Sequence, residues 1–114
     1  MNADKDFVPY QPSLDMKEIG FNEPCFATYD EDKNFELQDF FQTYETFPSH
    51  IVAAPTFSQA FRWFREKYGV HMYPTKFDET KWWIQWGTWT SKVFDTFEEA
   101  ELDCLKKLIE IVKQ

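Results

Sequence analysis

Strand-forming stretches occur in two consecutive runs in this chain, and their order is the feature that most constrains its fold. The first run covers residues 24–53 and the second covers residues 70–95, and an amphipathic helical pattern follows each run. A parallel sheet would instead alternate single strands with helices. The order α-ββ-(β)-α-βββ-α therefore predicts an α+β fold. We expect an antiparallel sheet, built from an N-terminal hairpin and a C-terminal meander, with about three helices packed on one face.

The C-terminal helix has the strongest signals. Thr96 and Glu99 form a capping box at its start, and the helical pattern continues from Phe97 to about Lys113. Acidic residues gather in its first turns and lysines in its last, which suits the helix dipole. Its apolar stripe is predicted to comprise Phe97, Ala100, Cys104, Leu105, Leu108, Ile111 and Val112.

Two further helices are predicted from their end signals. The first covers residues 12–19, with Ser13 as its N-cap and Gly20 as its stop. The second starts at a capping box formed by Thr56 and Gln59 and continues to the next glycine.

Strands are predicted in the stretches between the helices, and the acidic sequence DEDK at residues 30–33 is predicted to be a hairpin turn. The predicted strands are Pro24–Tyr29, Asn34–Gln38, a short Ile51–Ala53, and the meander of Val70–Tyr73, Lys81–Thr90 and Lys92–Asp95.

The charge of the chain is concentrated in its first half. Residues 1–50 hold eleven acidic and three basic residues, whereas residues 51–114 hold nine of each, so the net charge of −8 lies in the first half. This charge argues against direct nucleic-acid binding and against an anionic membrane as partner. The length of 114 residues predicts a single domain covering 1–114, with residues 1–8 as a flexible arm and a second flexible stretch at residues 43–49.

The location is predicted from apolar segments and cysteine usage. No apolar run approaches the roughly 18 residues of a membrane span, and the first residues lack the apolar segment of a signal peptide. Cys25 and Cys104 are the only cysteines, which favours two buried free thiols over a disulfide scaffold. A Cys25–Cys104 bridge is the alternative. We expect a cytoplasmic protein.

Motifs for catalysis, metals and cofactors are weak or missing in the sequence. Asp30, Asp32 and Asn34 match the first ligand positions of a calcium loop, but Phe35 and Phe41 occupy the positions that need Gly and Glu. The scattered Cys and His residues lack zinc spacing, and a Cys25 nucleophile would depend on a histidine brought close by folding. No phosphate-binding glycine motif occurs. We therefore expect no metal, no cofactor and no enzymatic activity.

Three stretches resemble a known group of proteins. They are FNEPCFATYD at residues 21–30, FSQAFRWFREKYG at residues 57–69, and TFEEAELDCLKKLIEIVKQ at residues 96–114. Together they resemble a family of small uncharacterised proteins encoded in the genomes of gut Bacteroidetes, such as Bacteroides, and in their phages and prophages. The resemblance implies an origin in a mobile element and a cytoplasmic location. It implies no activity and transfers no functional site.

The tryptophan-rich strand KWWIQWGTWT at residues 81–90 suggests a binding surface. Strict alternation along one strand predicts that Trp82, Ile84 and Trp86 pack beneath the helices. The opposite face would be open and dented at Gly87, unless the N-terminal hairpin or the Phe40–Phe41 segment covers it. The candidate binding residues on this open face are His71, Tyr73, Trp83, Gln85 and Trp89.

Three functions are compatible with these observations. A non-catalytic interaction module, binding a protein partner or forming a homodimer, fits the high aromatic content, because Trp and Tyr are enriched at interfaces. An acidic decoy that imitates nucleic acid and blocks a host protein fits the charge of the first half. A binder of a small flat ligand would use the aromatic face of the sheet.

Overall fold

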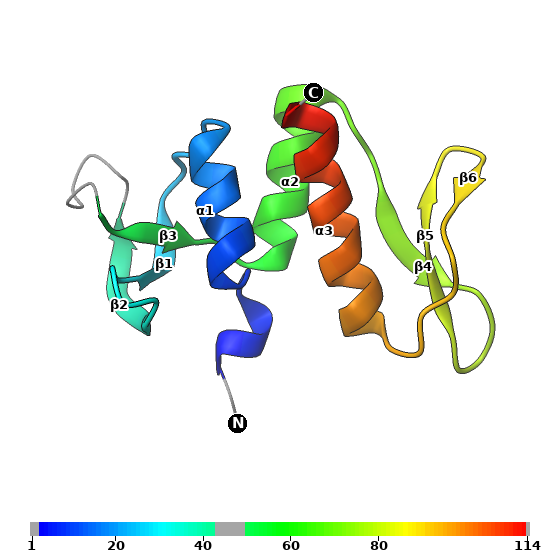
Figure 1. Ribbon diagram of the computed structural model, residues 1–114, viewed down its shortest axis with the longest axis horizontal. Coiled ribbons are helices and arrows are strands. Elements are labelled where there is room, and N and C mark those ends of the chain that lie inside the picture. Colours follow the sequence, from blue (N-terminus) through cyan, green and yellow to red (C-terminus); the bar gives the residue numbers. More distant parts are fainter. Residues whose placement is uncertain (1–2, 43–49, 114) are drawn as a thin grey trace. The chain divides into compact units, whose positions relative to one another are not determined.

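The computed structural model describes residues 3–42 and 50–113. The chain divides into two compact units, which we call unit 1 (through residue 59) and unit 2 (from residue 60). Within the described residues, three α-helices and two antiparallel sheets of three strands each form an α+β fold in the predicted order (Figure 1). The class and the element order are confirmed. The strands form two sheets rather than one, because each run of strands pairs only within itself.

The elements of unit 1 are η1 (Ala3–Asp6), α1 (Tyr10–Glu18), β1 (Cys25–Tyr29), β2 (Phe35–Gln42) and β3 (Val52–Ala54). The strands form a sheet in the order β2-β1-β3, with helix α1 against β3 (Figure 1). The central strand β1 pairs antiparallel with both neighbours, and the predicted hairpin and the predicted short extra strand are both present.

The described part of the expected N-terminal arm is packed against the rest of unit 1. Residues 3–6 form the 3-10 helix η1, and Phe7 makes a β-bridge to Thr56. Val8 is fully buried, and its amide donates a hydrogen bond to the carbonyl of Pro55 at 2.8 Å. The expectation of flexibility for residues 43–49 lies outside the described residues.

Helix α1 ends as predicted but begins differently. Its N-cap is Pro9, and Ser13 lies inside the helix, where its buried hydroxyl donates a hydrogen bond to the carbonyl of Val8 at 3.0 Å. The predicted N-cap role of Ser13 is therefore wrong. At the other end Gly20 has φ +105°, and the amide of Phe21 bonds the carbonyl of Met16, which is the closing bond of a Schellman motif.

The core of unit 1 is an aromatic cluster around β1. Tyr29 contacts the rings of Tyr10 and Phe35 at centroid distances of 5.6 Å, and Phe35 contacts Phe7 at 5.4 Å. The hydroxyl of Tyr29 donates to the carbonyl of Val8 at 3.0 Å. Phe7, Tyr10 and Phe35 are partly buried and pack around the buried ring of Tyr29.

The elements that contribute to unit 2 are the larger part of α2 (Phe57–Tyr68), β4 (Tyr73–Lys76), β5 (Trp82–Trp86), β6 (Trp89–Thr90) and α3 (Phe97–Lys113). The strands form a sheet in the order β4-β5-β6 (Figure 1). Both β4 and β5 contact helix α3.

The meander of unit 2 differs from the predicted one. The predicted long strand at residues 81–90 divides into β5 and β6, because the chain reverses at Gly87 and Thr88. Gly87 has φ +61°, whereas Thr88 does not have a positive φ, which matches a two-residue type II′ turn. The predicted third strand, Lys92–Asp95, is reduced to a single bridge between Trp82 and Phe94.

Helices α2 and α3 both start at a threonine cap. The amide of Gln59 donates to the Thr56 hydroxyl at 3.1 Å, although the Gln59 side chain donates to the carbonyl of Pro24 instead of completing the box. In α3 the predicted stripe is largely buried, and Leu105 and Leu108 are at most 1% exposed. Phe97 is more exposed than predicted, at 36%, whereas Ile109, outside the predicted stripe, is buried.

Candidate functional site

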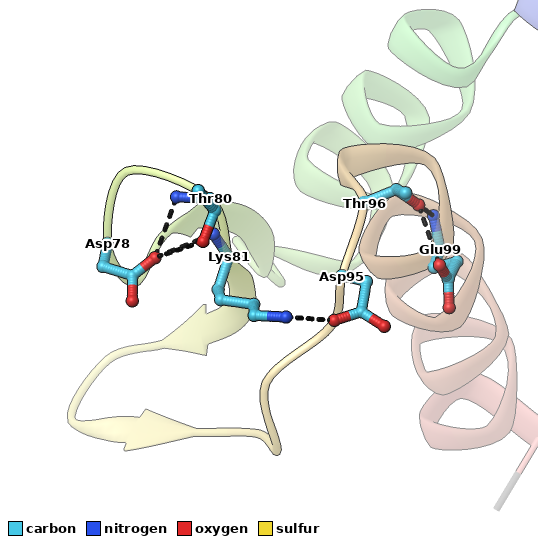
Figure 2. A network of polar contacts seen from close by, with 6 residues as sticks. All are labelled: Asp78, Thr80, Lys81, Asp95, Thr96 and Glu99. Carbon is cyan, nitrogen blue, oxygen red and sulfur yellow. Dashed lines mark hydrogen bonds and ion pairs between the residues drawn. The ribbon is translucent and has the colours of Figure 1, made fainter.

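A polar turn orders the loop between β4 and β5 in unit 2 (Figure 2). One carboxylate oxygen of Asp78 accepts hydrogen bonds from the backbone amides of Thr80 and Lys81, both at 2.9 Å. The first of these bonds is the main cause that lowers the pKa of Asp78 below its usual 3.8. Hydrogen bonds from the loop's own backbone amides to Asp78 therefore stabilise its conformation.

Lys81 connects this loop to the segment that precedes α3 (Figure 2). Its ammonium group forms a charged hydrogen bond with Asp95. This bond raises the pKa of Lys81 above 10.5 and lowers that of Asp95 below 3.8. The next residue, Thr96, accepts the amide of Glu99 at 3.1 Å, as the predicted cap requires, and its hydroxyl donates to the Glu99 carboxylate at 3.1 Å. The sheet of unit 2 is thus tied to the start of α3.

The strand register assigns the predicted site residues to the faces of this sheet. Tyr73 pairs with Gln85, and Thr75 pairs with Trp83, so Tyr73, Trp83 and Gln85 share one face. Trp83 is half-buried and contacts Phe77 at a ring centroid distance of 4.8 Å. His71 precedes β4, and its ring lies 5.0 Å from that of Tyr73.

Trp89 lies on the other face, and its predicted grouping with Trp83 is wrong. Trp89 pairs directly with Trp86 across the turn, so both indoles point to the face that carries Ile84. The prediction assumed that side chains alternate along one continuous strand. Because a two-residue turn places Trp86 and Trp89 directly opposite each other, Trp89 lies on the face of Trp86 instead. The sequence also predicts a dent in the sheet surface at Gly87. In the structure this glycine instead lies in the turn, where it supplies the positive φ.

The face of Ile84 becomes exposed towards the turn. Ile84 is fully buried, whereas Trp86 and Trp89 are 42% and 44% exposed. The expectation that Trp86 packs beneath the helices is wrong, because a cavity separates α3 from this part of the sheet. A cavity of about 350 Å³ lies beside the two indoles, within the range of volumes that binding pockets have. The residues that line it are Met72, Trp86, Trp89, Lys107, Glu110 and Ile111.

The two exposed indoles differ from the other tryptophans in their contacts. Trp63 contacts the rings of Phe64 and Tyr68, and Trp82 contacts Phe97 at 5.0 Å. Among residues 3–42 and 50–113, no aromatic ring and no cation lies against Trp86 or Trp89. These indoles therefore offer unused ring surface at the cavity.

Helix α3 supplies one charge of each sign to the cavity. Lys107 forms an ion pair with Asp103, one turn earlier, at 3.5 Å. Glu110 is exposed, and it takes part in no ion pair within the described part of the chain. The carboxylate of Glu110 is therefore open to a group that enters the cavity.

Sequence reasoning found Trp89 but missed the rest of this site. The sequence Trp-Gly-Thr-Trp at residues 86–89 carries a usable signal, because Gly at the first position of a two-residue turn is typical of a hairpin. That signal would have paired Trp86 with Trp89. No local signal brings Met72 or α3 to the same place, because their approach depends on tertiary packing.

The two thiols are poor nucleophiles. Cys25 and Cys104 are both free and buried, so the alternative of a disulfide between them is not realised. Burial is the main cause that raises the pKa of each thiol to about 12. The thiolate form needed for attack is therefore rare at neutral pH.

The acidic loop of unit 1 is built as a turn. Asp30 accepts hydrogen bonds from the amides of Asp32 and Asn34, at 2.8 and 2.9 Å, and Lys33 adopts a left-handed φ of +68°. These hydrogen bonds lower the pKa of Asp30, and the bond from the Asn34 amide has the largest effect. In the described part of the chain, no group of three His, Cys, Asp or Glu residues is placed to hold a metal ion.

Comparisons with known proteins add no relative: no protein-family model, curated protein or solved structure matches the chain. None of the helices in residues 3–42 and 50–113 combines the length and the apolar character that a membrane crossing needs.

Proposed function

We propose that this protein is a non-catalytic protein-interaction module that binds a protein partner through Trp86 and Trp89. The observation that carries the proposal is the pair of half-exposed indoles at a cavity of about 350 Å³, with no ring or cation against them among the described residues. Interface hot spots are enriched in tryptophan and often lie at pockets, so two exposed tryptophans beside a cavity are typical of a hot spot. The burial of both thiols supports a role without nucleophilic catalysis.

The test is a selection of binding peptides from a random displayed library on the immobilised protein. We expect selected peptides to lose at least tenfold in affinity for the double variant Trp86→Ala/Trp89→Ala. Leu37→Ala, which removes a side chain that is 52% exposed in unit 1, is the matched control and should bind as the wild type does. Failure to select any peptide, or equal binding by the double variant, would contradict the proposal.

A second copy of the chain is the alternative partner. Sedimentation velocity of the wild type and of the double variant distinguishes it, because a homodimer through the two indoles would dissociate on their removal. A dimer that survives in the double variant would assign self-association to another surface.

The acidic decoy stays a hypothesis that rests on charge alone. All of the net charge of −8 falls within residues 1–59, whose eleven acidic residues face only three basic ones. Binding through this charge would weaken steeply as the salt concentration rises, whereas binding through the indoles would not. An origin in a mobile element and a cytoplasmic location rest on the family resemblance and on the sequence, and genomic context is their direct test.

A further inference from the structure

The cavity at Trp86 and Trp89 has a chemical preference that can be argued from the rest of unit 2. Its walls are apolar at Met72, Ile111 and the two indoles, and its charged groups are Lys107 and Glu110. Lys107 already has a carboxylate partner in Asp103, at 3.5 Å. Glu110 is the group whose charge is left for a ligand.

Other aromatic rings of unit 2 show what covers an exposed ring face in this protein. The ammonium group of Lys67 lies 5.3 Å from the ring centre of Trp63, and that of Lys76 lies 5.2 Å from the ring centre of Trp82. Such contacts are cation–π interactions, in which the negative ring face attracts a cation. In the part of the chain that the structure describes, no lysine or arginine makes a cation–π contact with Trp86 or Trp89.

We propose that the occupant of this cavity is a basic side chain, arginine above all, from a protein partner. This inference rests on the proposed function and adds the chemistry of the partner. The guanidinium group would stack on an indole and pair with the carboxylate of Glu110, while its methylene stem contacts Met72 and Ile111. Arginine suits the site better than lysine, because its planar group stacks on rings and is more weakly hydrated.

The charge balance of unit 2 does not oppose a basic partner, because residues 60–114 hold nine acidic and nine basic residues. The preference for a cation is therefore local and comes from the indoles and Glu110. A neutral apolar side chain would also fill the cavity, but it would not pair with the exposed carboxylate of Glu110. A sugar ring would stack on an indole and would not respond to removal of the Glu110 charge.

The test compares two probes of the same shape, the capped tripeptides Ac-Gly-Arg-Gly-NH₂ and Ac-Gly-citrulline-Gly-NH₂. Citrulline replaces the charged guanidinium by a neutral urea group. Both are titrated into the ¹⁵N-labelled full chain, and the indole N–H signals are followed by NMR. Signals of Trp63, Trp82 and Trp83 are internal references, because those rings have partners of their own.

We expect the arginine peptide to shift the Trp86 and Trp89 signals with an affinity about three- to tenfold higher than that of the citrulline peptide. Glu110→Gln should remove most of this difference, whereas Glu98→Gln, at the start of the same helix, should leave it unchanged. Equal shifts by both peptides, or no shift by either, would overturn the inference.

The peptide selection described above separates this result from the proposed function. Selected peptides that need Trp86 and Trp89 but carry apolar residues instead of arginine or lysine would overturn the basic-side-chain inference and leave the interaction module standing. A selection without any binder would overturn both. Enrichment of arginine, lost in Glu110→Gln, would support both.

Discussion

An aromatic cluster in unit 1 and the indole pair of unit 2 differ in whether their rings have aromatic partners. In unit 1, Tyr29 and Phe35 contact each other and further rings, so the cluster closes on itself. In unit 2, Trp86 and Trp89 stay half-exposed beside a cavity. The net charge is also distributed unequally, because unit 1 carries all of it and residues 60–114 are neutral. A high aromatic content therefore says little about binding until the partners of each ring are known.

The largest expected effect compares two tryptophans of unit 2. Trp63→Ala should lower the free energy of unfolding by about 3–5 kcal/mol, because its side chain is 5% exposed and packs on two rings. Trp89→Ala should lower it by about 1 kcal/mol or less, because its indole is 44% exposed. Urea denaturation measures both. Similar losses would mean that Trp89 is part of the core.

The second effect tests the phase of α3. Leu108→Ala should cost about 2–5 kcal/mol of unfolding free energy, because Leu108 is 1% exposed and its truncation leaves a void. Lys107→Ala, one residue earlier, should cost under about 0.5 kcal/mol, because the ion pair with Asp103 lies at the surface. Comparable urea midpoints would contradict the placement of both side chains.

A smaller effect is expected in the closed cluster of unit 1. Tyr29→Phe keeps the ring contacts and removes only the hydrogen bond to the carbonyl of Val8. Because the Ser13 hydroxyl also donates to that carbonyl, the loss should be about 0.5–1.5 kcal/mol. Thermal unfolding measures it, and a loss as large as that of Trp63→Ala would show that the hydroxyl does more than bond this carbonyl.

The smallest expected effect concerns pH and the contact between Lys81 and Asp95. The folded pKa of Asp95 lies below its usual 3.8, so its contribution is present above that pH and is lost as the pH falls through the folded pKa. The folded pKa of Lys81 lies above 10.5, so its contribution is lost as the pH rises through that value. The stability difference between wild type and Asp95→Asn should be constant from about pH 5 to pH 10 and shrink outside this window. A difference that changes within the window would implicate another group.

The parts of the fold that sequence predicts well are those with local causes. The threonine cap of α3 and the glycine that ends α1 involve residues within five positions of each other, and both predictions are confirmed. Errors arose where the cause is not local. β4 begins where the predicted strand ends, and it accommodates Pro74 because β4 is an edge strand of its sheet.

The candidate site was only partly predictable for the same reason. Tyr73, Trp83 and Gln85 share a face through simple alternation, which sequence shows directly. The approach of Glu110 to Trp86 and Trp89 depends on how α3 packs against the sheet. The pattern of apolar residues does not specify that packing.

The two-residue turn at Gly87 and Thr88 also makes the site adjustable by a change in length. Because β6 has only two residues, an inserted residue that keeps a two-residue turn would shift their pairing by one place and turn Trp89 to the face of Trp83, whereas an insertion accommodated as a three-residue loop would keep the pair. The rest of the sheet would keep its register, since β4 and β5 pair independently of this turn. A single inserted codon could thus take apart the paired indoles while the chain keeps its core, so gain or loss of binding in related sequences can be sought in the length of this turn.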